Sequence, residues 1–136
     1  MKKYGYHSRY VLKGGALFLK KNDPRWKDYM EFKKRHGFSP DEIWSLEESQ
    51  AIFMFPRLRY YRIHTPGSWP ADIKKYETWK KMLDDMIFMF EQMAGGNSYF
   101  PDDEKLERLG MTKDEYMKRM RRGKRLFGKY WTGLWC

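Results

Sequence analysis

Cysteine is almost missing from this chain, and the only one, Cys136, is the last of the 136 residues. A single thiol cannot form an internal disulfide, so the sequence is not that of a secreted, disulfide-stabilised scaffold. A thiol at a chain end is also a poor candidate for a catalytic nucleophile, because chain ends are rarely held rigidly. The reducing environment of a cytoplasm fits this composition.

Long apolar segments are missing as well. The longest, residues 51–55 and 86–90, are far shorter than the roughly 20 residues that a helix needs to span a bilayer. The N-terminal residues include lysines but lack the apolar segment that a signal peptide requires. We therefore expect neither a membrane-spanning helix nor a secretory leader.

The sequence also lacks recognisable catalytic and cofactor motifs. The pairs Gly14-Gly15 and Gly95-Gly96 lack the spacing and the lysine of a phosphate-binding loop, and there is no Gly-x-Ser-x-Gly segment. The three histidines are too far apart in the sequence to form a local metal pair. The acidic pairs are adjacent residues, so on a helix their side chains point in different directions. We predict a protein that is not an enzyme, with no catalytic residue, metal site or cofactor.

Positive charge and aromatic side chains are what the chain has in excess. Lys and Arg number 28 against 18 Asp and Glu, for a formal net charge of +10, and 18% of the residues are aromatic. Basic and aromatic residues are interleaved in two stretches, 57–62 and 121–127. A cation beside an aromatic ring can hold a phosphate and stack a base, and net positive charge attracts anions. The composition therefore favours a phosphate-bearing partner.

Helix start and stop signals divide the first half of the chain. Asp23-Pro24 predicts the start of a helix that ends at Gly37, and Ser39-Pro40 predicts another helix start. A capping box at residues 45–48 predicts a long helix from Leu46 to about His64. Pro56 lies inside this helix and predicts a kink, because proline removes one backbone hydrogen bond.

The second half of the chain predicts three further helices. Apolar residues at helical spacing indicate a helix from about Ala71 to Ala94. Residues 102–109 indicate a short helix that closes at Gly110. A capping box at residues 112–115 begins a helix with one apolar stripe that runs nearly to the C-terminus.

We therefore predict an all-α fold: one helical domain over residues 1–136, with three or four main helices in a compact bundle. Residues 1–22 show no clear helical period and are predicted to form an irregular or hairpin N-terminal arm. The short loop between the two long apolar helices makes them antiparallel neighbours. The side chains expected to share their core are Phe53, Phe55, Met86 and Phe90.

Two carboxylates lie within the most apolar predicted helix. At least one of Asp84 and Asp85 is expected to be partly buried, and a buried carboxylate needs a basic partner. Arg57 or Arg59 is the partner that we expect. An ion pair is the interpretation favoured over a catalytic acid.

The predicted ligand-binding residues come from two helices and one loop. Arginine grips phosphate at two points through its planar guanidinium group, which lysine cannot do. A kink at Pro56 and the loop that carries Trp69 predict a concave site suited to a compact ligand, whereas an extended basic face would suit a duplex. The predicted set is Arg57, Arg59, Tyr60, Tyr61, Arg62, His64, Trp69, Arg121, Arg122 and Arg125.

From about His36 onward, four segments carry a further signal: Gly37-Phe38 leading to Trp44 and Leu46-Glu47, then Pro56-Arg57-Leu58, Met86-Ile87-x-x-Phe90, and the segment from Gly123 to Tyr130. In these segments the chain resembles a family of short, largely uncharacterised tailed-phage proteins. The resemblance implies a phage origin and a location in the host cytoplasm. It implies no catalytic residue that can be transferred to this chain.

The leading functional prediction is a phage-encoded, non-enzymatic binding protein that captures a phosphorylated, nucleotide-like ligand, for instance a signalling nucleotide of host defence. Two alternatives stay open: a nucleic-acid-binding accessory protein, which the same residues would serve, and an inhibitor that docks on an acidic host protein. Assembly into a homo-oligomer also stays open. No membrane partner is expected.

Overall fold

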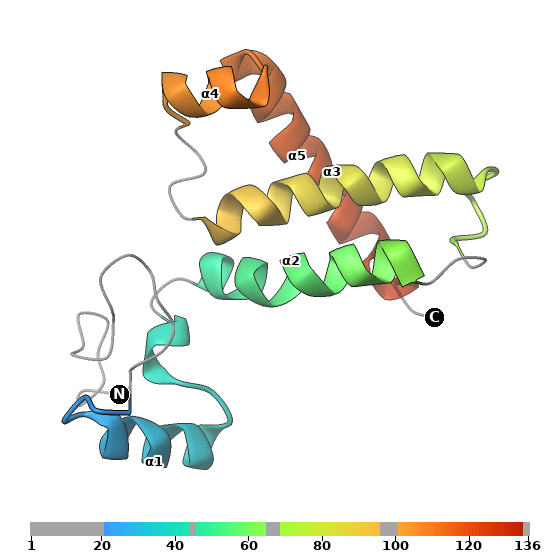
Figure 1. Ribbon diagram of the computed structural model, residues 1–136. Helices are drawn as coiled ribbons and strands as arrows, with labels where there is room; N and C mark the ends of the chain where they lie inside the picture. The colour runs from blue at the N-terminus through green and yellow to red at the C-terminus, as the bar shows by residue number, and fades with distance from the viewer. Residues whose placement is uncertain (1–20, 44–45, 65–68, 96–100, 135–136) are drawn as a thin grey trace. The chain divides into compact units, whose positions relative to one another are not determined.

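The computed structural model describes residues 21–43, 46–64, 69–95 and 101–134 (Figure 1). Within these ranges every regular element is a helix, which confirms the predicted all-α class. The predicted N-terminal arm lies almost wholly outside the described residues. The chain divides into two compact units, residues 1–50 and 51–136, and each is described by itself. The assignment of the whole chain to one domain stays a prediction.

The first unit contains helix α1, Trp26–His36, which ends where the sequence predicts. Gly37 follows it with a left-handed φ of 80°, and its N–H donates to the carbonyl of Lys33. The start of α1 falls later than predicted, because Asp23 does not cap the helix. Its carboxylate instead accepts hydrogen bonds from the backbone and the guanidinium group of Arg25, at 2.7 to 2.9 Å. These side-chain and backbone bonds lower the pKa of Asp23 from 3.8 to about 2.

A 3₁₀ helix, η2 (Pro40–Ile43), occupies the second predicted helix start. The backbone N–H and the hydroxyl of Ser39 both donate to the carboxylate of Glu42, at 2.5 and 2.7 Å. The bond from the Ser39 N–H to Glu42 is half of a capping box, but the Glu42 N–H donates to the Ser39 carbonyl and not to its hydroxyl. The Ser39-Pro40 signal therefore marks a short turn and not a full helix.

Helix α2, Leu46–His64, has both of its predicted ends, and Pro56 lies inside it. Ser45 of the predicted capping box lies outside the described residues, and the kink at Pro56 stays a prediction. Helix α3, Tyr76–Ala94, ends as predicted but begins after the predicted Ala71. The reason is a turn at Pro70, whose carbonyl accepts from the N–H of Ile73 at 3.0 Å.

Local capping determines where helix α4 ends and where helix α5 begins, as the sequence predicts. Helix α4, Asp103–Leu109, ends at Gly110, which has a φ of 65°. Helix α5, Lys113–Tyr130, begins with a complete capping box, in which Thr112 and Glu115 each accept the other's backbone N–H. A 3₁₀ turn, η3 (Trp131–Gly133), follows α5.

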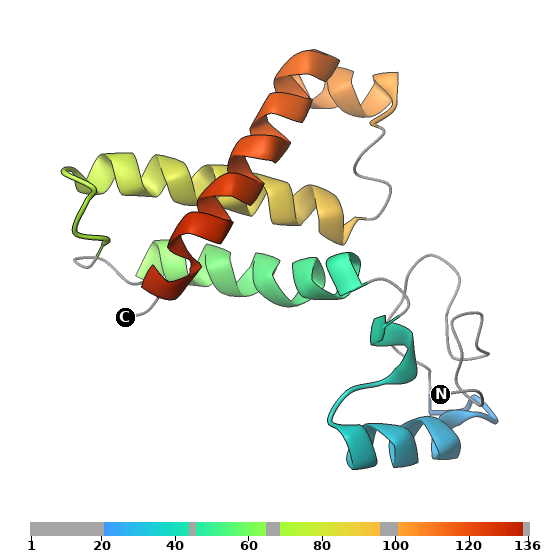
Figure 2. The same cartoon turned by 180° about the vertical axis from the view of Figure 1, so that it is seen from behind.

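Helices α3 and α5 form the main packing contact of the second unit, and they cross at Gly123 (Figures 1 and 2). A Cβ atom at Gly123 would lie only 2.6 Å from the carbonyl oxygen of Asp85 and from Cβ of Met89. Glycine is therefore the residue that lets the two helix backbones approach this closely. The core around this crossing draws on α2, α3 and α5 and includes Ala51, Leu58, Trp79, Leu83, Met86, Phe90, Tyr116, Met120 and Tyr130.

The predicted core is correct for three of its four residues. Met86 and Phe90 are buried, and Phe55 packs half-buried against the same cluster. Phe53 was predicted wrongly, since 54% of it is exposed. Residues 51–55 are all apolar, so their side chains surround α2. Only one side of the helix can face α3. Ala51 and Leu58 mark that side.

Candidate functional site

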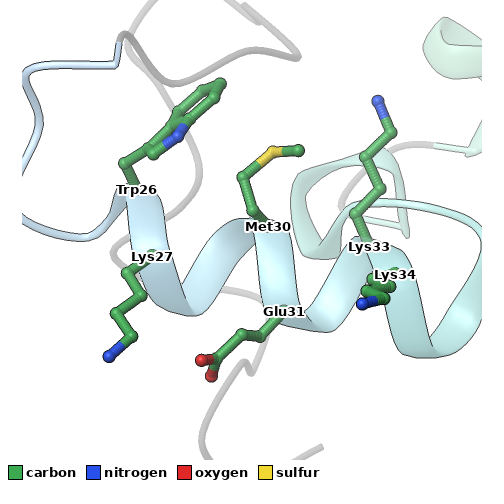
Figure 3. A pocket seen from close by; sticks show the side chains of 6 residues that line it. All are labelled: Trp26, Lys27, Met30, Glu31, Lys33 and Lys34. Atoms are coloured by element: carbon green, nitrogen blue, oxygen red, sulfur yellow. The ribbon is translucent and has the colours of Figure 1, made fainter.

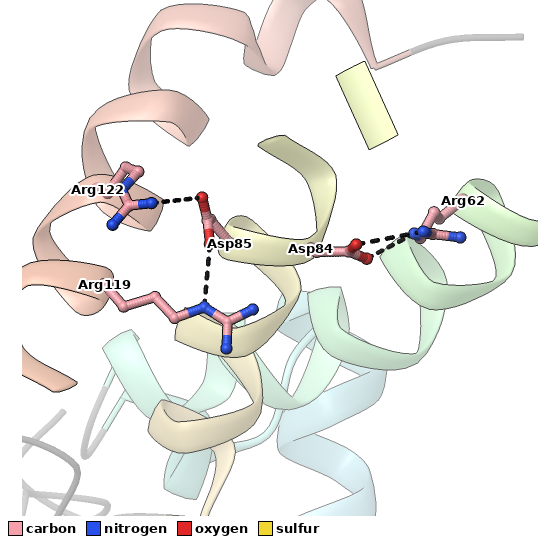
Figure 4. Close-up of polar contacts among 5 residues, drawn as sticks. All are labelled: Arg62, Asp84, Asp85, Arg119 and Arg122. Atoms are coloured by element: carbon pink, nitrogen blue, oxygen red, sulfur yellow. Dashed lines mark hydrogen bonds and ion pairs between the residues drawn. The ribbon is translucent and has the colours of Figure 1, made fainter. Parts of the chain in front are cut away.

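The three predicted arginines of α2 do not share one side of the helix. Residues advance about 100° around a helix, so Arg57 and Arg59 lie on nearly opposite sides of α2. Arg62 faces α3, where its guanidinium group donates to both oxygens of Asp84, at 2.5 and 3.2 Å (Figure 4). Arg57 and Arg59 are exposed, and their guanidinium groups lie over the rings of Phe53 and Phe55, at 3.7 and 5.4 Å.

The predicted aromatic residues are divided between the surface and the core. Tyr60 is exposed and packs against the ring of His64, with the two ring centroids 4.0 Å apart. Tyr61 is half-buried and packs against the core. Trp69 is held by its indole N–H, which donates to the carbonyl of Ile73 at 2.8 Å. The predicted residues of α2 and Trp69 therefore do not surround a single binding site.

The sequence predicts an ion pair for one of Asp84 and Asp85, and in the structure both form one, with neither Arg57 nor Arg59 as the partner. The side chain of Asp85 is only 14% exposed and accepts from Arg119 at 3.0 Å and from Arg122 at 3.3 Å (Figure 4). The predicted partners Arg57 and Arg59 were wrong. Arg57 and Arg59 lie over the rings of Phe53 and Phe55 of their own helix, whereas Arg119 and Arg122 flank the α3–α5 crossing. Arg122, a predicted ligand-binding residue, is thus engaged by Asp85.

The strongest concentration of positive charge lies on α5. This helix carries eight basic and two acidic residues. Its apolar stripe, which includes Tyr116, Met120 and Tyr130, is buried in the core, so the opposite side of the helix faces outward. Four basic residues spaced three and four apart follow that outward side, and we call them the basic ridge: Lys118, Arg121, Arg125 and Lys129.

The two arginines of the basic ridge are its most available cations. Arg121 and Arg125 lie one helical turn apart and are exposed, and no carboxylate within the described ranges pairs with either of them. Lys118 pairs with Asp114 at 3.1 Å and Lys129 with Asp72 at 4.0 Å. These four side chains are more than half exposed, and such surface pairs are weak, so both lysines can exchange partners. Among the predicted site residues, Arg121 and Arg125 are the exposed arginines that share one side of a helix and have no carboxylate partner within the described ranges.

A cavity of about 600 Å³ lies beside α1, in the first unit. Figure 3 shows Trp26, Met30 and Lys33 projecting to one side of the helix, and Lys27 and Glu31 to the other. Sequence reasoning proposed no site here, although Trp26, Met30 and Lys33 have the spacing of a shared helix face. The ten predicted site residues are not among those that line this cavity.

The described residues contain no group of three or more His, Cys, Asp and Glu side chains placed to hold a metal ion. None of the described helices combines the length and the apolar character needed to cross a membrane.

Comparison with known proteins gives no match. No protein-family model matches the chain, and no curated protein or solved structure is significantly similar to it. The resemblance to tailed-phage proteins therefore stays a prediction.

Proposed function

We propose that this protein binds nucleic acid through the basic ridge of α5, by contacts to phosphates that do not depend on base sequence. The observation that carries the proposal is the pair Arg121 and Arg125, exposed one turn apart and without a carboxylate partner among the described residues. Guanidinium groups bind phosphate oxygens at two points, and neutralising phosphates releases counterions from the nucleic acid.

The dimensions of the ridge fit a polymer better than a compact ligand. With a rise of about 1.5 Å per residue, the ridge from Lys118 to Lys129 spans roughly 16 Å. That length faces about five successive nucleotides of one duplex strand, at 3.4 Å each. The ridge contains no aromatic or amide side chain, which are the types that stack on bases or read adenine. All four side chains of the ridge are cations, and phosphate is the anion that every nucleotide offers them whatever its base.

The expected effect of removing the two arginines is a loss of both affinity and salt sensitivity. For a 20-base-pair duplex, Arg121→Ala with Arg125→Ala should weaken binding about tenfold or more. The slope of log affinity against log salt should become shallower by about two, one unit for each lost phosphate contact. Fluorescence anisotropy across a series of NaCl concentrations measures both quantities.

Lys33→Ala with Lys34→Ala is the matched control, because it removes the same charge from exposed positions on α1. It should leave the salt slope nearly unchanged. Equal losses in the two double variants would mean that net charge alone attracts nucleic acid. A salt-independent affinity would contradict the proposal altogether.

Capture of a compact phosphorylated nucleotide, the leading prediction from the sequence, is the second candidate. The observation that favours it is the α1 cavity, where an aromatic ring and a cation, Trp26 and Lys33, project to the same side (Figure 3). A role against host defence, a phage origin and a host-cytoplasm location belong to this candidate. A mononucleotide or short cyclic oligonucleotide that raises the melting temperature, and loses this effect in Lys33→Ala with Lys34→Ala, would favour it over the basic ridge.

A further inference from the structure

Helix α2 has apolar side chains on its outward side as well as its buried side. Phe53, Tyr60 and Ile63 are 54%, 66% and 62% exposed, and Pro56 is also exposed. A helix at the surface of a domain normally carries polar residues on the side opposite its core stripe. The outward side of α2 breaks this rule over three helical turns. We call it the α2 outer face: Phe53, Pro56, Arg57, Tyr60, Ile63 and His64.

The spacing of these residues is that of a helix-packing surface. Phe53 and Tyr60 are seven residues apart, as are Pro56 and Ile63. The two pairs interleave in steps of three and four, the pattern by which one helix presents a continuous seam to another. A neighbouring helix could therefore pack along the α2 outer face with apolar residues of matching period.

Two arginines and a histidine lie within or beside this seam. The guanidinium group of Arg57 lies 3.7 Å from the centroid of the Phe53 ring and donates one hydrogen bond to the carbonyl of Phe53, at 2.8 Å. Guanidinium has five N–H donors, so most of them stay available to an acidic group. His64 packs on Tyr60, and Arg59 is exposed on the neighbouring side of α2. A partner on this face would meet apolar surface bordered by basic groups.

We infer that the α2 outer face docks an amphipathic helix of a partner protein, one whose apolar stripe is flanked by Asp or Glu. Charge complementarity favours this occupant over a second copy, because two chains with a formal charge of +10 repel each other. The types of side chain on the α2 outer face favour a partner helix over nucleic acid. Pro56 and Ile63 offer no ring for base stacking, and the Phe53 and Tyr60 rings each already contact a neighbouring group.

The test selects peptides from a display library of random 16-residue sequences on the immobilised full-length chain. Enriched peptides should share apolar residues at helical spacing with flanking Asp or Glu. Their affinity should fall at least tenfold for Phe53→Ser with Tyr60→Ser, and at least tenfold for Arg57→Glu. Both variants change exposed residues, and circular dichroism with a thermal melt checks that they fold. Arg121→Ala with Arg125→Ala should bind the peptides as the unchanged chain does, which separates this surface from the basic ridge.

Three results would overturn the inference. The first is that no acidic amphipathic peptide is enriched, or that enriched peptides bind the folded Phe53→Ser with Tyr60→Ser variant equally well. The second is a dimer of the unchanged chain in sedimentation velocity that dissociates in that variant, which would make a second copy the occupant. The third is that the variant loses binding to a 12-nucleotide single strand while it retains the peptides, which would assign the face to nucleic acid.

Discussion

Replacing Gly123 with leucine should destabilise the protein by about 3 kcal/mol or more, near or above the upper end of the range for overpacked cores. The added side chain begins with a Cβ atom 2.6 Å from the Asp85 carbonyl and from the Met89 Cβ atom, and neither atom belongs to a flexible side-chain end. Helices α3 and α5 would have to separate at their crossing. The free energy of unfolding, measured in urea by circular dichroism, should fall accordingly.

Gly128 offers a matched control on the same helix. It is exposed, and a Cβ atom there would meet nothing within 4 Å among the described residues. Gly128→Ala should therefore stabilise the protein by about 0.5–1 kcal/mol, because alanine loses less backbone entropy in a helix. Similar effects at both glycines would show that α3 and α5 do not approach closely at Gly123.

Phe90→Ala should destabilise the protein by about 3–5 kcal/mol, as expected for a buried phenylalanine that leaves a cavity. Phe90 is 4% exposed, and its ring packs edge-to-face on Phe127 with the centroids 4.8 Å apart. The substitution therefore removes both apolar burial and a ring contact. Urea unfolding again gives the measurement.

Phe53→Ala is the comparison that makes this prediction specific. The ring of Phe53 is more than half exposed, so its truncation should change the free energy of unfolding by no more than about 0.5 kcal/mol. The sequence predicts that both phenylalanines share one core, whereas the structure separates them. Equal destabilisation by the two substitutions would support the sequence-based core and contradict the exposed α2 outer face.

Features that depend on neighbouring residues alone could be predicted from the sequence. Gly37 and Gly110 end α1 and α4 because glycine accepts a left-handed φ without strain. Thr112 and Glu115 begin α5 because their side chains reach each other's backbone N–H across one turn. The positions of the helices followed from such signals and from apolar periodicity.

Features that depend on contacts between distant segments could not be predicted. The start of α3 is a local exception: the segment before it carries no cap, and the Trp69 indole N–H donates to the carbonyl of Ile73. Asp85 pairs with Arg119 and Arg122 because α5 crosses α3 beside it, and no local pattern specifies that crossing. The α2 arginines look like one cluster in the sequence, but Arg57 lies nearly opposite Arg59 and Arg62 is paired with Asp84, whereas Arg121 and Arg125 of α5 stay together.

A nuclear magnetic resonance titration with a 20-base-pair duplex tests the nucleic-acid interface most directly, because it locates the contact in the folded chain. Shifts of the backbone amides should concentrate at residues 118–129 of α5 and disappear in Arg121→Ala with Arg125→Ala. Amides of the α2 outer face and of α1 should change little. Shifts that concentrate on α1 or α2, or that persist unchanged in the double variant, would contradict the assignment of nucleic-acid binding to the basic ridge.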